Sequence, residues 1–137
     1  MVRIHSVHII DFMMATLFQI IQSPRIKKLK KSSSPKLKEN PQKKAVCLRV
    51  LTISPKKPNS ANRRIIKASL THFKTRLTAK IAGENHNLQQ HSTVLIHGSR
   101  IHDLIGVSYT AVRGKYDLFG VVNRKTKRSL FGVKKNS

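Results

Sequence analysis

A short segment of prolines, lysines and small polar residues has the composition best suited to binding chemistry. It reads Ser54-Pro55-Lys56-Lys57-Pro58-Asn59-Ser60-Ala61. Each proline fixes its own φ and favours extended backbone in the residue before it, which predicts a stiff loop. Lysines bind phosphate, and Asn59 and Ser60 offer hydrogen-bond donors and acceptors to a sugar or a base. The pattern therefore predicts a loop that contacts nucleic acid.

The charge of the chain favours the same partner. The 137 residues include 28 Lys and Arg against 5 Asp and Glu, giving a net charge of +23. Self-repulsion of this size destabilises a compact monomer and favours a polyanionic partner. The basic residues do not follow one face of an amphipathic helix, so RNA or DNA is predicted as the partner and a membrane is not.

No residue pattern in the sequence is typical of catalysis. There is no Walker loop, nucleophile elbow or dinucleotide fingerprint, and the few carboxylates form no acid–base pair. His86 and His91 lack a third ligand nearby, so loop or RNA contacts are favoured over a metal site. Cys47 is the single cysteine, which excludes an internal disulfide, and its apolar surroundings predict a core position. We expect a protein that is not an enzyme and has neither cofactor nor metal.

The elements that must position the proline-rich loop are predicted to be strands, because apolar and polar residues alternate from Ala45 onward. In the third strand, Leu77, Ala79 and Ile81 are expected to face inward. Five short strands with regularly spaced loops fit a small closed all-β barrel such as the five-stranded OB-fold, although periodicity alone does not exclude an SH3-like barrel. The predicted strands are one from Ala45 into the proline-rich loop, then Arg63–Thr71, Thr75–Ala82, Thr93–His97 and Ser108–Arg113.

Basic segments flank this barrel. The predicted parts are an N-terminal extension over residues 1–44, an OB-fold barrel over 45–122 and a basic C-terminal tail over 123–137. The apolar run Ile9–Ile21 is shorter than the ~20 residues of a membrane helix and lacks a signal cleavage site. A short helix over Ala15–Gln22, stopped by Pro24, is predicted instead.

The segment of residues 23–44 is rich in Lys, Ser and Pro and cannot bury enough apolar surface to fold alone. We expect it to be an arm that becomes ordered on RNA. In the C-terminal segment, the dense positive charge around Phe131 favours phosphate binding over a solvated terminus. Base stacking is conceivable for four aromatic residues, although packing in the core or under a loop is favoured. These four are Tyr109, Tyr116, Phe119 and Phe131.

In this order, the segments resemble the bacterial and organellar family of small-subunit ribosomal protein S twelve. The resemblance extends from about Met14 to Lys135, and its specificity comes from the ordered co-occurrence of short motifs. The motifs are Pro41-Gln42-Lys43-Lys44-Ala45-Val46-Cys47, Pro55-Lys56-Lys57-Pro58-Asn59-Ser60-Ala61, Gly83-Glu84, His86-Asn87-Leu88-Gln89, His91-Ser92, Val94-Leu95-Ile96, Asp103-Leu104, Gly106-Val107, Val112-Arg113-Gly114 and Gly132-Val133-Lys134-Lys135.

The resemblance implies an OB-type barrel at the decoding centre of the small ribosomal subunit. Its implied partners are small-subunit rRNA, the mRNA–tRNA complex in the A site and neighbouring ribosomal proteins. The first decoding loop matches Lys56, Lys57, Pro58, Asn59 and Ser60, and it implies contact with the rRNA nucleotides that inspect codon–anticodon pairing. Changes at the two lysines would alter accuracy and the streptomycin response. The second decoding loop matches Arg100, His102 and Asp103.

The basic arms are expected to bind rRNA phosphates. The residues are Lys27, Lys28, Lys30, Lys31, Lys43, Lys44, Arg124, Lys125, Arg128, Lys134 and Lys135. The second loop departs from the family pattern, which has Lys before the aspartate and Pro two residues after it, where this chain has His102 and Ile105. Residues 1–13 precede the usual start of the family at Met14, which suggests a lineage-specific extension.

The composition also favours a compartment. Lys outnumbers Arg and Ile is frequent, which fits an AT-rich genome such as that of a mitochondrion. We therefore expect a mitochondrial ribosome, with a plastid or a bacterial cytoplasm as alternatives.

Two other classes of function stay open from the sequence. A free-standing OB-fold RNA chaperone or single-strand-binding protein would bind RNA alone in solution, and cosedimentation with small subunits at high salt would separate it from a ribosomal protein. A cationic membrane-active peptide conflicts with the turn-separated strand pattern, and vesicle leakage at low concentration would indicate it.

Overall fold

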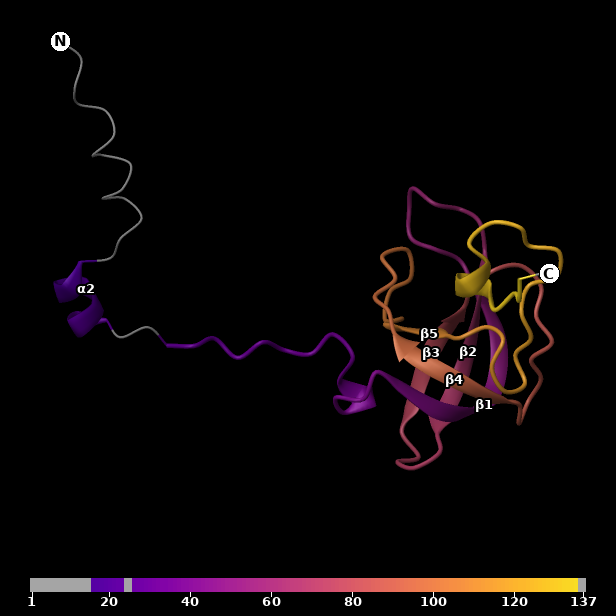
Figure 1. Ribbon diagram of the computed structural model, residues 1–137, viewed down its shortest axis with the longest axis horizontal. Coiled ribbons are helices and arrows are strands. Elements are labelled where there is room, and N and C mark those ends of the chain that lie inside the picture. Colours follow the sequence, from indigo (N-terminus) through magenta and orange to yellow (C-terminus); the bar gives the residue numbers. More distant parts are fainter. Residues whose placement is uncertain (1–15, 24–25, 136–137) are drawn as a thin grey trace, which may run out of the picture. The chain divides into compact units, whose positions relative to one another are not determined.

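The computed structural model describes residues 16–23 and 26–135 (Figure 1). The chain forms two compact units, Met1–Lys31 and Ser32–Ser137. The predictions made for residues 1–13, for Ala15 and for Pro24 lie outside the described residues. The proposed division of the chain at residues 44 and 122 stays a prediction.

Among the described residues of the N-terminal unit, Leu17–Gln22 form a short helix, α2. Its first turn is closed by a capping box, in which the Gln19 backbone N–H donates to Thr16 Oγ1 at 3.4 Å and the Thr16 N–H donates to Gln19 Oε1 at 3.1 Å. The helix is solvent-exposed throughout, with Leu17 79% exposed. No helix among residues 16–23 and 26–135 is long and apolar enough to cross a membrane.

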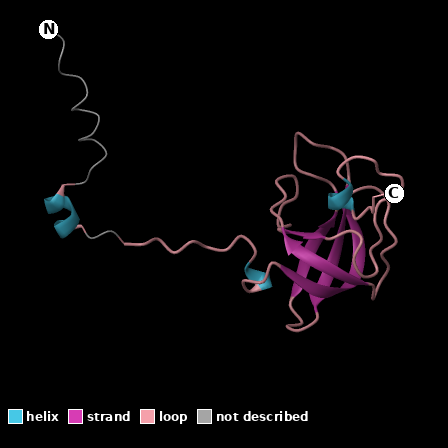
Figure 2. Cartoon of the chain, viewed as in Figure 1, coloured by secondary structure: helices cyan, strands magenta, loops and turns pink. Residues whose placement is uncertain are grey.

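Five strands close into a barrel, which confirms the predicted all-β fold (Figures 1 and 2). The order around the barrel is β1-β2-β3-β5-β4, and β1 pairs with both β2 and β4. Neighbours are antiparallel except β3 and β5, which are parallel. The architecture is that of the five-stranded OB-type barrel. The strands are β1 Gln42–Ile53, β2 Arg63–Leu70, β3 Arg76–Ile81, β4 Thr93–Gly98 and β5 Tyr109–Ala111.

The alternation of apolar residues places the main core inside the barrel. In β3, Leu77, Ala79 and Ile81 are buried, as predicted. Cys47 is fully buried in β1, and burial raises the pKa of its thiol. The register of β1 against β2 shifts between Cys47 and Arg49, so the strand carries a bulge at this point.

Two strands differ from their predicted bounds by more than one residue. β1 begins at Gln42, before the predicted start at Ala45, because Gln42 and the two lysines after it pair with β4. Their polar side chains give no alternation that a sequence pattern could detect. β5 is shorter than predicted and ends at Ala111.

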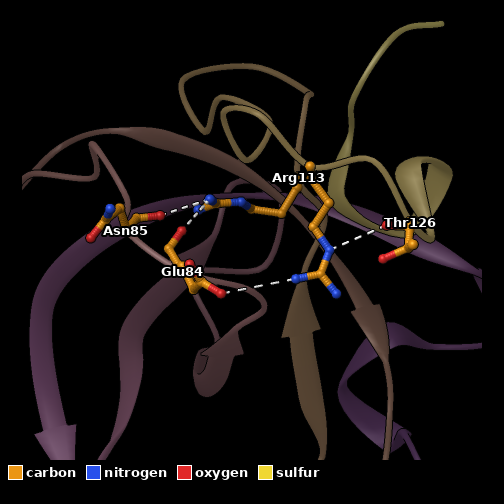
Figure 3. A network of polar contacts seen from close by, with 5 residues as sticks. Glu84, Asn85, Arg113 and Thr126 are labelled. Carbon is orange, nitrogen blue, oxygen red and sulfur yellow. Dashed lines mark hydrogen bonds and ion pairs between the residues drawn. The ribbon is translucent and has the colours of Figure 1, made fainter.

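Arg113, beyond β5, joins two loops of the barrel (Figure 3). Its side chain is 5% exposed, and its Nη2 donates to the backbone oxygens of Glu84 and Asn85 at 2.7 Å each. Burial lowers the pKa of the guanidinium. The C-terminal segment then packs on the barrel through a 3-10 turn, η2, over Arg128–Phe131. Phe131 is buried, and its backbone oxygen accepts from Val121 N–H at 3.0 Å.

Candidate nucleic-acid interface

The first candidate loop, residues 54–62, connects β1 to β2 and contains two hydrogen bonds of its own. Asn59 N–H donates to the Lys56 oxygen at 3.1 Å, and Ser54 Oγ donates to Asn62 Oδ1 at 3.1 Å. The peptide bond before Pro58 is cis. All five predicted site residues of the loop, from Lys56 to Ser60, are solvent-exposed. The structure therefore shows a loop whose polar groups are accessible and whose turn is closed locally.

The second candidate loop, residues 99–108, is anchored by a small hydrophobic cluster separate from the main core. Leu104 and Val107 of the loop are buried against Ile65 of β2. Leu51 and Ile101 pack against this cluster. The loop is thus attached to the ends of β1 and β2, which also carry the first loop.

Asp103 connects the two loops. Its backbone oxygen accepts from Lys56 N–H at 3.0 Å, and its Oδ1 accepts from Asn59 Nδ2 at 3.1 Å. Its Oδ2 lies 3.5 Å from Arg63 Nη2. Both ionic side chains are about one-third exposed, so the pair contributes at most about 1 kcal/mol. Three contacts to one residue nevertheless give the loops a common geometry.

A groove of about 470 Å³ lies beside these loops and collects cations from both. Lys56 of the first loop lines it together with Arg100 and His102 of the second. Lys57, Pro58, Asn59 and Ser60 are not among its lining residues. The groove suits a phosphate group, because two permanent cations and an imidazole from separate loops converge on it.

A second cationic groove, of about 430 Å³, lies in the C-terminal segment. The structure brings together four of the residues predicted for the arms, whereas Lys135 does not line this groove. The guanidinium of Arg124 lies 4.0 Å from the Phe131 ring centroid, and its Nη1 lies 4.0 Å from Glu84 Oε1. The four lining cations are Arg124, Lys125, Arg128 and Lys134.

The other predicted arm residues line neither groove. Lys43 Nζ is buried without a hydrogen-bond partner among the described residues, and it lies 4.3 Å from the Phe73 ring centroid. Lys44 Nζ lies 5.2 Å from the Tyr116 ring centroid. The remaining four, Lys27, Lys28, Lys30 and Lys31, are exposed and belong to the N-terminal unit.

The loop between β3 and β4, which contains His86 and His91, has several polar contacts. Leu88 N–H donates to His86 Nδ1 at 3.2 Å, and Arg64 Nη1 lies 3.2 Å from His86 Nε2. Burial, and secondarily the charges of Arg64 and Arg113, lower the pKa of His86. Among residues 16–23 and 26–135, no three His, Cys, Asp or Glu side chains are grouped so that they could hold a metal.

The four aromatic residues divide into two pairs. Tyr109 and Phe131 are buried, as the packing interpretation predicts. Tyr116 and Phe119 are 44% and 68% exposed, so their rings are accessible to a base. Tyr109 lies at the start of β5 and Phe131 in η2, whereas Tyr116 and Phe119 lie outside the named helices and strands.

The contacts of Asp103 and of Arg113 were not predicted from the sequence. The pairing of Arg63 with Asp103 joins residues 40 positions apart in the chain. No sequence pattern around Arg113 indicates that its guanidinium donates to the backbone oxygens of a loop 28 and 29 residues earlier in the chain. The available signal for the pairing of Asp103 is the scarcity of acids, because an acidic residue in so basic a chain is expected to lie near a cation.

An OB-type barrel with an exposed proline-rich loop and cationic grooves is typical of nucleic-acid-binding proteins. Residues 30–137 match the family model described as Ribosomal protein S12/S23. The chain belongs to the ribosomal protein S12/S23 family, which confirms the resemblance over this range. It is a small-subunit ribosomal protein with rRNA and ribosomal proteins as partners and the ribosome as its location. The family is in general structural and not enzymatic.

Proposed function

We propose that this protein binds rRNA at the decoding centre and helps to set the accuracy of codon–anticodon pairing in the A site. The observation that carries the proposal is the connection of the two loops through Asp103. Family membership supplies the small subunit as the setting. The exposure of Asn59 and Ser60 leaves the Ser60 hydroxyl and the Asn59 side-chain oxygen accessible for the rRNA and mRNA–tRNA contacts that the proposal requires.

In this mechanism Asn59 and Ser60 recognise the closed arrangement of rRNA around a correct codon–anticodon pair. Asn59 Nδ2 is held by Asp103 Oδ1 at 3.1 Å, so its amide is oriented before RNA binds. Preorganisation of this kind reduces the entropy lost on binding. Lys56, Arg100 and His102 neutralise phosphate beside the loops.

The basic residues outside the loops bind rRNA without reading its sequence. The C-terminal groove presents four cations, and the lysines of residues 27–31 and 43–44 add further charge. Phosphate contacts position a protein on nucleic acid but carry no base information. We further propose a mitochondrial ribosome as the location, supported by the Lys and Ile bias, with plastid and bacterial ribosomes as alternatives.

The test is a misreading assay on small subunits reconstituted with full-length variants. We expect Asn59→Ala and Ser60→Ala to change the error rate while incorporation into subunits is unchanged, because neither side chain is buried. Ser129→Ala is the matched control, since Ser129 is also exposed but lies in η2, outside both loops. Normal incorporation with an unchanged error rate in both loop variants would contradict the proposed role.

A further inference from the structure

A third cationic groove crosses the outer face of β1, β2 and β3, and neither loop contributes to it. It has a volume of about 550 Å³ and shares no lining residue with the other two cationic grooves. Its cations come from four separate parts of the chain, so no sequence motif marks it. The cations are Lys36, Arg49, Lys67 and Arg76, and Leu48, Leu77 and Thr78 complete the lining.

The strand register places like charges in direct opposition. Arg49 of β1 pairs with Lys67 of β2, and Lys67 pairs with Thr78 of β3. Like charges that face each other across a sheet are destabilising. The bulge between Cys47 and Arg49 sets this register, so the repulsion is built into the barrel. A bound anion would remove it.

Lys36 is held at the groove by the segment before β1. Its backbone N–H donates to Tyr109 Oη at 3.2 Å, and its Nζ donates to the Arg76 backbone oxygen at 2.7 Å. The neighbouring Leu37 is buried in the main core. The fourth cation is therefore positioned by the fold and is not merely an exposed flexible side chain.

No carboxylate neutralises this groove within the described residues. Their acids are Glu39, Glu84, Asp103 and Asp117, and none lines the groove. The ion pairs found among residues 16–23 and 26–135 use Asp103 and Glu84, which pair with Arg63 and Arg124. Its four cations are thus available to an external anion.

We propose that this groove binds the sugar–phosphate backbone of RNA, at a contact separate from both loops. The inference rests on the proposed rRNA partner. The two guanidiniums suit bidentate phosphate contacts, and Lys67 adds a point charge. Leu48 and the stems of the long side chains provide an apolar surface for ribose carbons between the phosphates.

The first test measures lysine acylation in the full-length wild-type chain, with and without a single-stranded oligouridylate. We expect RNA to slow the labelling of Lys67 several-fold. Lys74 and Lys115 are internal controls, because both are exposed and line none of the cationic grooves. Equal protection of all three lysines would overturn the proposal. Protection of Lys67 by polyglutamate as strong as that by RNA would overturn the assignment to RNA.

The second test compares two double variants of equal net charge. Arg49→Gln with Lys67→Gln removes two groove cations, and Lys74→Gln with Lys115→Gln removes two cations outside it. The plot of log Kobs against log salt for oligouridylate should become shallower by about 1.4 in the groove variant, the value for two single-strand phosphate contacts. Equal slopes in the two variants would refute the groove.

These outcomes are independent of the accuracy proposal. Unchanged misreading in the Asn59 and Ser60 variants with Lys67 protected would leave the groove in place and remove the decoding role. Altered misreading with Lys67 unprotected would do the reverse. Acylation of the wild-type chain also keeps the test decisive if a double variant fails to fold.

Discussion

The two candidate loops meet at Asp103, but they are held in place by different kinds of contact. The first loop has prolines at positions 55 and 58 and a turn closed between Asn59 and Lys56. The second depends on Leu104 and Val107, which are buried against Ile65 of β2. The first loop is shaped in part by nearby residues, besides its two bonds to Asp103, whereas the second is anchored by residues distant in the chain. Only the order that arises from residues close together in the chain can be recognised in a sequence.

The largest effect should come from the anchor of the second loop. We expect Leu104→Ala to lower the free energy of unfolding by about 2 to 3 kcal/mol, since it leaves a cavity in the smaller hydrophobic cluster. Amide exchange over residues 99–108 should rise more than exchange over the turn at Asn59. Denaturant unfolding and hydrogen exchange measure the two effects.

The control for this prediction is the next residue, Ile105→Ala. Its side chain is 88% exposed, so the change in stability should stay within about 0.5 kcal/mol. If both loops exchanged faster to the same extent in Leu104→Ala, the difference between local and tertiary order would be wrong.

An intermediate effect is expected at the connection between the loops. Asp103→Ala removes the acceptor for Asn59 Nδ2 and the partner of Arg63, and should cost about 1 kcal/mol. Asp103→Asn keeps a side-chain oxygen for Asn59 and should cost less. The backbone bond from Lys56 to Asp103 can persist in both variants. Thermal unfolding ranks the two changes, and an equal loss in both would show that the Asn59 contact contributes nothing.

The smallest effect concerns the stiffness of the first loop. Pro55→Ala should destabilise the protein by about 0.4 to 1 kcal/mol, mainly because the unfolded chain gains conformational freedom. Amide exchange in the second loop should be unchanged, since its hydrophobic anchor is intact. Faster exchange at Val107 in this variant would show that the hydrophobic anchor alone does not order the second loop.

Most of the barrel could be predicted from alternation. Each of the five strands lies where polarity predicted one, and the inward residues of β3 are those expected. The early start of β1 was missed because Lys43 and Lys44 are polar although they pair with β4. Alternation of polarity indicates which side chains are buried. The pairing of Lys43 and Lys44 with β4 is formed by backbone hydrogen bonds, which do not depend on side-chain polarity.

The candidate sites could be predicted less completely. The proline-bracketed loop was recognisable because its stiffness arises from residues adjacent in the chain. The contact of Asn59 with Asp103 spans 44 residues and was not predicted. The groove lined by Lys36, Arg49, Lys67 and Arg76 was not predicted either, because these residues are far apart in the sequence.

Composition and local pattern were therefore sufficient for the basic character of the chain, its five strands and the stiffness of its first loop. These properties depend on residue types and on neighbours within a few positions. The contact between the two loops at Asp103 and the cross-strand pairing of Arg49 with Lys67 depend instead on how the strands pair. Barrel closure and the bulge in β1 set that pairing, and both result from packing among residues far apart in sequence.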